Sequence, residues 1–96
     1  MVAVWTDLAS QDLKNIFSYI SKSSPYYAHL VRKQFLRKSK ELTRFPDIGR
    51  TPPENGLSEY REIFVYSYRL IYRITQENIY IVAIVHMRQK LQLNHD

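Results

Sequence analysis

The chain has 96 residues, 45% of them hydrophobic, so we expect a single packed domain over residues 1–96 rather than a disordered segment. The sequence contains no cysteine, which excludes disulfides, thiolate catalysis and cysteine-based metal sites and fits a reducing cytoplasm. The 14 lysines and arginines against nine acidic residues give a net charge of +5, which favours an anionic partner, although such charge also serves solubility.

The first half of the chain predicts a short strand followed by two helices. Residues 1–5 are β-prone, and the hydroxyl of Thr6 is suited to cap a helix. The apolar residues that follow are spaced as one face of an amphipathic helix: Ala9, Leu13, Ile16, Phe17 and Ile20. Ser24 before Pro25 is a second helix start, and the next break falls at 45–49. Two helices joined by a short polar turn predict a helical hairpin.

No targeting or membrane segment is apparent. The first residues lack a basic leader, and the longest apolar stretch near the end, 79–85, is about a third of the roughly 20 residues that a membrane span needs. We therefore expect a soluble, cytoplasmic protein without membrane contact.

The second half of the chain predicts a loop and three strands. Both glycines and two of the four prolines fall between residues 49 and 56, which predicts the loop. Three β-prone segments follow, at 60–65, 68–74 and 79–86, with turns so short that neighbours must be antiparallel. The order β-α-α-β-β-β predicts an α+β fold, a helical hairpin packed on one face of a small, mainly antiparallel sheet. The last eight or so residues are expected to form a short helix or to be disordered.

Basic residues mark two surfaces of this predicted fold. In the middle strand, Arg69, Ile71 and Arg73 share one face, and the residues between them share the other. One face can therefore pack on the hairpin while the opposite face presents arginines. The second helix carries a basic outer face, which is either a binding surface or an ordinary solvated one: Lys33, Arg37, Lys40 and Arg44.

A series of motifs, in the same order over most of the chain, carries a family resemblance. The helices contain Ala9-x-x-Asp12-Leu13-x-x-Ile16-x-x-Tyr19-Ile20, Ser24-Pro25-x-x-Ala28 and Leu42-x-x-Phe45-Pro46-x-x-Gly49-Arg50. The strands contain Tyr60-Arg61-Glu62-Ile63, Tyr68-Arg69-Leu70-Ile71-Tyr72-Arg73 and the stretch from Ile81 to Val85 followed by His86. Together these motifs resemble the ParE branch of the RelE/ParE superfamily of bacterial toxins, known from plasmid stabilisation systems.

The resemblance implies a toxin that a cognate antitoxin neutralises. ParE-like members are described as poisoning DNA gyrase, and RelE-like members as cleaving mRNA on the ribosome. The resemblance to the ParE branch therefore implies a gyrase inhibitor that acts by binding, with a ribosome-dependent mRNA endoribonuclease as the alternative. We expect the antitoxin to cover the arginine face with an acidic, amphipathic C-terminal segment. The residues expected to contact the antitoxin or the target are Arg61, Arg69, Arg73, His86 and Arg88.

A ribonuclease would need a base, an acid and cations around the phosphate. If the chain were one, the candidates implied are Glu54, Arg69, His86 and Arg88. Three of them have another interpretation. Arg69 could pair with Glu62 across the sheet, Glu54 could be a solvated loop carboxylate, and His86 could be structural or contact the antitoxin.

Departures from the RelE pattern favour ParE, so no residue is assigned a catalytic role. Met87 falls near the place of a RelE arginine or histidine, and a thioether can neither donate a proton at neutral pH nor carry charge. The tail after Arg88 has no tyrosine, and 55–59 lacks the lysine pair of RelE-like enzymes. The three histidines are too far apart in sequence for a metal site, and we expect no cofactor.

Overall fold

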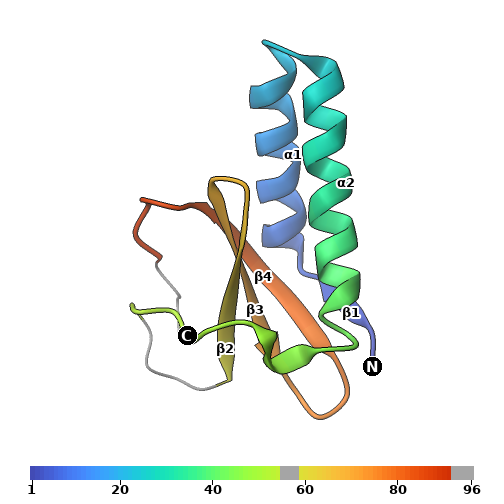
Figure 1. Cartoon of the computed structure of the whole chain (residues 1–96), viewed down its shortest axis with the longest axis vertical. Coiled ribbons are helices and arrows are strands. Elements are labelled where there is room, and N and C mark those ends of the chain that lie inside the picture. Colours follow the sequence, from blue (N-terminus) through green and yellow to red (C-terminus); the bar gives the residue numbers. More distant parts are fainter. Residues whose placement is uncertain (55–58, 92–96) are drawn as a thin grey trace.

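The computed structural model describes residues 1–54 and 59–91, and its architecture is the predicted one (Figure 1). The helical hairpin packs against one face of a four-stranded sheet, and it projects beyond the sheet at one end. The elements are β1 (Ala3–Trp5), α1 (Asp7–Ser21), α2 (Pro25–Glu41), the 3-10 helix η1 (Pro46–Ile48), β2 (Tyr60–Val65), β3 (Tyr68–Ile74) and β4 (Ile79–His86).

Both helices begin where the capping signals predict. The hydroxyl of Thr6 accepts a hydrogen bond from the N–H of Ala9, and the hydroxyl of Ser24 accepts one from Tyr27. Pro25 occupies the first turn of α2, where its missing N–H costs nothing. No helix in the described ranges is long and apolar enough to cross a membrane.

The sheet has the order β1-β4-β3-β2. Its three later strands form an antiparallel meander, and β1 pairs in parallel with β4. A register shift in the β3–β4 ladder pairs Ile71 with Ala83 but Tyr72 with Ile81, so Val82 is the extra residue of a β-bulge. The carboxylate of Asp12 accepts a hydrogen bond from the N–H of Ile84 at 2.9 Å, which ties α1 to β4 just beyond the bulge.

The main core lies between the hairpin and the sheet. It combines alternate residues of the strands with the inner faces of both helices: Ala9, Leu13, Val31, Phe35, Leu42, Val65, Leu70, Tyr72, Ile79, Ile81 and Ile84. Removing this apolar surface from water is the principal force that holds the two layers together.

A smaller cluster covers the opposite face of the sheet. Leu91 packs there against Ile71 and Ala83, so the segment that follows β4 crosses back over the strands. Residues 87–91, which we call the C-terminal strap, form no helix in the structure. The prediction for the rest of the tail, residues 92–96, lies outside the described residues.

The turn after α2 is built around the hydroxyl of Tyr72. This hydroxyl donates to the carbonyl of Pro46 at 2.7 Å and accepts from the N–H of Gly49 at 2.9 Å. A Cβ on Gly49 would lie 2.5 Å from that hydroxyl oxygen and 2.7 Å from the carbonyl oxygen of Glu62. Only glycine allows the chain to pass this close to β3.

Candidate functional site

Arg69 is the centre of a network of charges that is buried at Arg69 and Glu62 and reaches the surface at its two ends. Its guanidinium donates to both carboxylate oxygens of Glu54, at 2.9 and 2.6 Å, and to Oε1 of Glu62 at 2.8 Å. The other oxygen of Glu62 accepts from Nε of Arg50 at 2.6 Å. The chain Arg50–Glu62–Arg69–Glu54 therefore contains two cations and two anions, and its formal charges cancel.

The network also fastens the C-terminal strap. Arg69 donates to the carbonyl of Gln89 at 2.7 Å, and Glu54 accepts from the N–H of Leu91 at 2.9 Å. One guanidinium thus joins β3, β2, the 50–54 loop and the strap. Its Nε is buried with no hydrogen-bond partner in the described part of the chain.

Neighbouring charges shift the pKa values of this network. The hydrogen bonds from Arg69 hold the pKa of Glu54 at about 2, against burial, which acts to raise it. The same pairing, first with Glu54 and then with Glu62, raises the pKa of Arg69. Glu54 is therefore a poor proton acceptor near neutral pH, because its conjugate acid is too strong.

The prediction that Arg69 lies on an exposed arginine face is wrong. The residue is only 4% exposed, and it pairs with Glu62 across the strands, which was the other interpretation of the sequence. The physical reason is that the loop and the strap cover this face of β3. Glu54 is likewise ion-paired rather than freely solvated.

Arg61 and Arg73, two of the other predicted contact residues, take no part in the network around Arg69. Arg73 is exposed at the end of β3 and lies 3.5 Å from a carboxylate oxygen of Glu59. Arg61 lies on the opposite face of β2 from Glu62, because side chains alternate along a strand, and it donates to the carbonyl of Gly49 at 2.8 Å.

His86 and Arg88 are exposed and lie beside two different hollows. The His86 ring packs edge-on against Tyr68, with 5.8 Å between ring centroids. Arg88 lines a hollow of about 470 Å³ with Glu54, Arg69 and Met87, whereas His86 lines another. The hollow thus unites three of the four candidate nuclease residues, and Met87, whose thioether has no acidic proton, lines it beside them.

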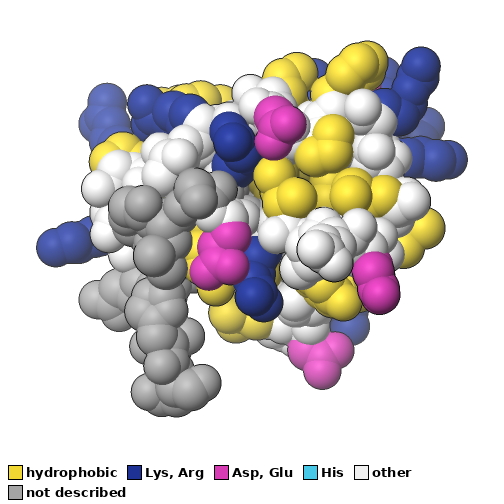
Figure 2. Space-filling model, turned by 90° about the horizontal axis from the view of Figure 1, so that it is seen from below, with side chains coloured by type: hydrophobic (Ala, Val, Ile, Leu, Met, Phe, Trp, Pro, Cys, Tyr) yellow, Lys and Arg dark blue, Asp and Glu magenta, His cyan; other side chains and the backbone are white. Residues whose placement is uncertain are grey.

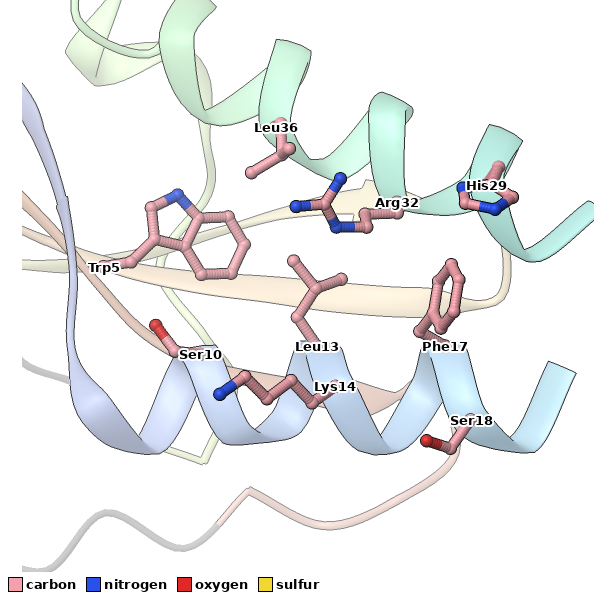
Figure 3. Close-up of a pocket in the computed structure, with 9 residues that line it drawn as sticks. All are labelled: Trp5, Ser10, Leu13, Lys14, Phe17, Ser18, His29, Arg32 and Leu36. Carbon is pink, nitrogen blue, oxygen red and sulfur yellow. The ribbon is translucent and has the colours of Figure 1, made fainter. Parts of the chain in front are cut away.

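A second candidate site, missed by the sequence interpretation, is a groove between α1 and α2 on the hairpin (Figure 3). It has a volume of about 590 Å³, within the range of ligand-binding pockets. Leu13 and Phe17 point into it from α1, and Trp5 closes one end. The indole N–H of Trp5 is fixed by a hydrogen bond to the hydroxyl of Ser39 at 3.2 Å.

The rim of this hairpin groove is cationic. Lys14 and Arg32 border it from opposite helices, and no carboxylate is among its described lining residues. Neither cation takes part in an ion pair within the described ranges. In the sequence, the groove is indicated only by Lys14 and Arg32, which lie between apolar residues of their helices. Periodicity alone cannot distinguish such basic residues from those of an ordinary solvated face.

Basic side chains also lie around the rim of the face shown in Figure 2, with an exposed hydrophobic area in its middle.

Within the described ranges, no group of three or more histidine or acidic residues could hold a metal ion.

Comparison with known proteins gives one family and several similar folds. The model of the ParE toxin of the type II toxin–antitoxin system parDE matches residues 3–91. A protein of the chromosomal ParDE system of P. aeruginosa is 21% identical with a TM-score of 0.75, covering 92% of this chain and 97% of that chain. No curated protein is detectably similar in sequence.

Two further solved structures share the fold. The YoeB/ParE toxin from Agrobacterium tumefaciens is 14% identical with a TM-score of 0.62, covering 90% of this chain and 98% of that chain. The YoeB dimer from Staphylococcus aureus is 16% identical with a TM-score of 0.62, covering 90% of this chain and 95% of that chain. At these identities the similarity concerns the fold alone.

Proposed function

The chain belongs to the ParE toxin family of type II toxin–antitoxin systems, which have a cognate antitoxin, and we propose that it inhibits DNA gyrase by binding, without cleaving RNA. The observation that supports this most directly is that the guanidinium of Arg69 is already occupied by hydrogen bonds within the chain. A guanidinium that already holds two carboxylates and a carbonyl has little capacity left for a phosphate.

The neighbouring groups support the same proposal. Glu54 stays ionised far below neutral pH and is held by Arg69, so it is unsuited to take a proton from a ribose hydroxyl. Met87 offers no charge and no proton in the hollow that Arg88 shares. A binding toxin needs none of these chemical functions. Its proposed site of action is the cytoplasm, where gyrase works.

Two assays separate this proposal from a ribosome-dependent endoribonuclease. The purified protein is added to DNA supercoiling by gyrase and, in parallel, to mRNA on purified ribosomes. We expect supercoiling to stop while the mRNA stays intact. Cleavage of the mRNA with normal supercoiling would instead establish the nuclease, and no effect in either assay would mean that the chain has lost toxicity.

We propose further that the antitoxin places an acidic, amphipathic segment in the hairpin groove. Lys14 and Arg32 lack carboxylate partners in the described structure, whereas Arg69 on the sheet already has two. The groove therefore offers apolar burial and uncompensated positive charge together. Exposed Arg73, His86 and Arg88 remain proposed as additional contacts with the antitoxin or the target.

The groove is tested by reversing its charges. The double variant Lys14→Glu, Arg32→Glu should slow association with the antitoxin at least about ten-fold, because electrostatic steering acts on the association rate. The double variant Lys33→Glu, Lys40→Glu, at exposed positions of α2 that do not line the groove, changes the net charge equally and is the matched control; it should change the rate by less than about two-fold. Equal effects of the variants, measured by stopped-flow fluorescence of Trp5, would place the antitoxin elsewhere.

A further inference from the structure

β2 is an edge strand, and part of its outer side is open. Among the described residues, no strand lies beside β2 on that side. There Glu62 exchanges two backbone hydrogen bonds with Arg50, at 3.0 and 2.7 Å. Because outward-facing groups recur at every second residue, the N–H and C=O of Phe64 point to the same open side. No described residue outside the β2–β3 ladder bonds to either group.

Exposed apolar side chains gather beside this open stretch. Phe45 is 58% exposed, Ile48 69% and Phe64 46%, although all three are large and hydrophobic. We call them the β2 edge patch. They line a hollow of about 90 Å³ together with Leu42 and Ile63. That is about three times the volume of a water molecule in the liquid, enough for one aliphatic side chain.

The patch is bordered by arginines. The guanidinium of Arg44 lies 5.7 Å from the ring centroid of Phe45, and that of Arg50 lies 5.0 Å from the ring centroid of Phe64. The one carboxylate among the described residues lining the hollow is Glu41, which already pairs with Lys38 at 3.6 Å. Arg44 belongs to no ion pair within residues 1–54 and 59–91.

We propose that the β2 edge patch binds a short, extended, acidic segment of a partner protein. Its backbone would pair with the N–H and C=O of Phe64, continuing along the edge from the point where the Arg50 bridge ends. One aliphatic side chain of the segment would fill the 90 Å³ hollow, and a flanking carboxylate would meet Arg44. This is recognition by strand addition, and it stands whether or not the chain inhibits gyrase.

A second copy of this chain fits the edge poorly. The free stretch lies between the bridge at Glu62 and the turn at Tyr66, so two copies could pair over only one or two residues. Self-association would also bring Arg44 and Arg50 towards the same groups of another molecule that carries a net charge of +5. An acidic peptide makes an equally short backbone contact, but it brings negative charge to Arg44 and can place an aliphatic side chain in the hollow.

The test uses NMR spectra of the isotope-labelled protein and the synthetic peptide acetyl-Glu-Val-Leu-Val-Glu-amide. We expect saturable shifts of the backbone amides of Phe64 and Val65, with a dissociation constant on the order of 1 mM, as suits so short a contact. Methylating the leucine nitrogen of the peptide, or replacing both glutamates by lysine, should each weaken binding at least about ten-fold.

Variants of the protein localise the contact. Ile48→Ser with Phe45→Ser should reduce affinity at least about ten-fold, and both side chains are exposed, so the fold should survive. Tyr26→Ser, a 75% exposed aromatic elsewhere, should have no effect. The proposal is overturned if no saturable shifts appear, if the methylated peptide binds equally well, or if the Phe64 amide shifts with protein concentration alone, which would indicate self-association.

Discussion

Replacing Arg69 by methionine would remove one partner of a buried ion pair while keeping an unbranched side chain that reaches about as far as Nε of the arginine. Glu62 is 1% exposed, and among the described residues each of its carboxylate oxygens has one hydrogen-bond donor. Without Arg69, its Oε1 would be buried with no donor from those residues. Glu54 would lose two hydrogen bonds, and the carbonyl of Gln89 in the C-terminal strap would lose one.

The expected loss is large for a domain of this size. Removing one partner of a buried pair costs about 3–5 kcal/mol, because the remaining charge stays desolvated. The total free energy of unfolding of such a domain is about 5–15 kcal/mol. In a domain of this size, each kcal/mol of lost stability lowers Tm by about 4–8 °C. We therefore expect Tm to fall by at least about 12 °C.

Urea unfolding, followed by the fluorescence of Trp5, the only tryptophan, measures this loss. The double variant Arg69→Met, Glu62→Leu should recover most of it, since it leaves no charge buried in the sheet. Arg73→Met, which breaks an ion pair between side chains that are nearly half exposed, is the control and should cost less than about 0.5 kcal/mol. A loss below about 1 kcal/mol for Arg69→Met, or a double variant less stable than the single one, would refute the reasoning.

Three other predictions concern single contacts. The pKa of Glu54 is about 2 in the folded chain against 4.5 normally, so the ion pair with Arg69 stabilises the fold above pH 4.5, and this stabilisation is lost as the pH falls towards 2. Glu54→Gln should therefore make the free energy of unfolding less dependent on pH in that window. An unchanged pH dependence would contradict the ion pair. Asp12→Ala should cost about 1–3 kcal/mol in urea unfolding because the N–H of Ile84 loses its acceptor, whereas Asp12→Asn should cost less. Gly49→Ala should lower the free energy of unfolding by about 1–3 kcal/mol through overlap with Tyr72, and calorimetry showing a Tm equal to that of the parent chain would disprove the close approach.

Local signals were sufficient to predict most of the fold. The caps at Thr6 and Ser24 depend on side chains within three residues of the bonds they make, so they can be recognised from the sequence alone. Alternation in β3 correctly placed Arg69 on the face away from the hairpin. It could not show that this face is covered, because the covering segments, the 50–54 loop and the strap, have no periodicity.

The contacts that the sequence did not predict are those between distant segments. Tyr72 holds the turn at Gly49 across 23 residues, and Asp12 reaches Ile84 across 72. The bulge at Val82 follows from the register of the β3–β4 ladder, to which no single residue type points. The hairpin groove requires two helices to be placed side by side before its lining residues can be seen to face one another.

The pairing of β1 with β4 determines when the sheet can fold during synthesis. Residues 3–5 find their partner only at 79–81, and the hydroxyl of Thr6 donates to the carbonyl of Ile81 across 75 positions. The sheet cannot close until synthesis has passed β4, and contacts this distant in sequence form slowly. A chain that stops before residue 79 would therefore leave β1 without its partner and the sheet incomplete.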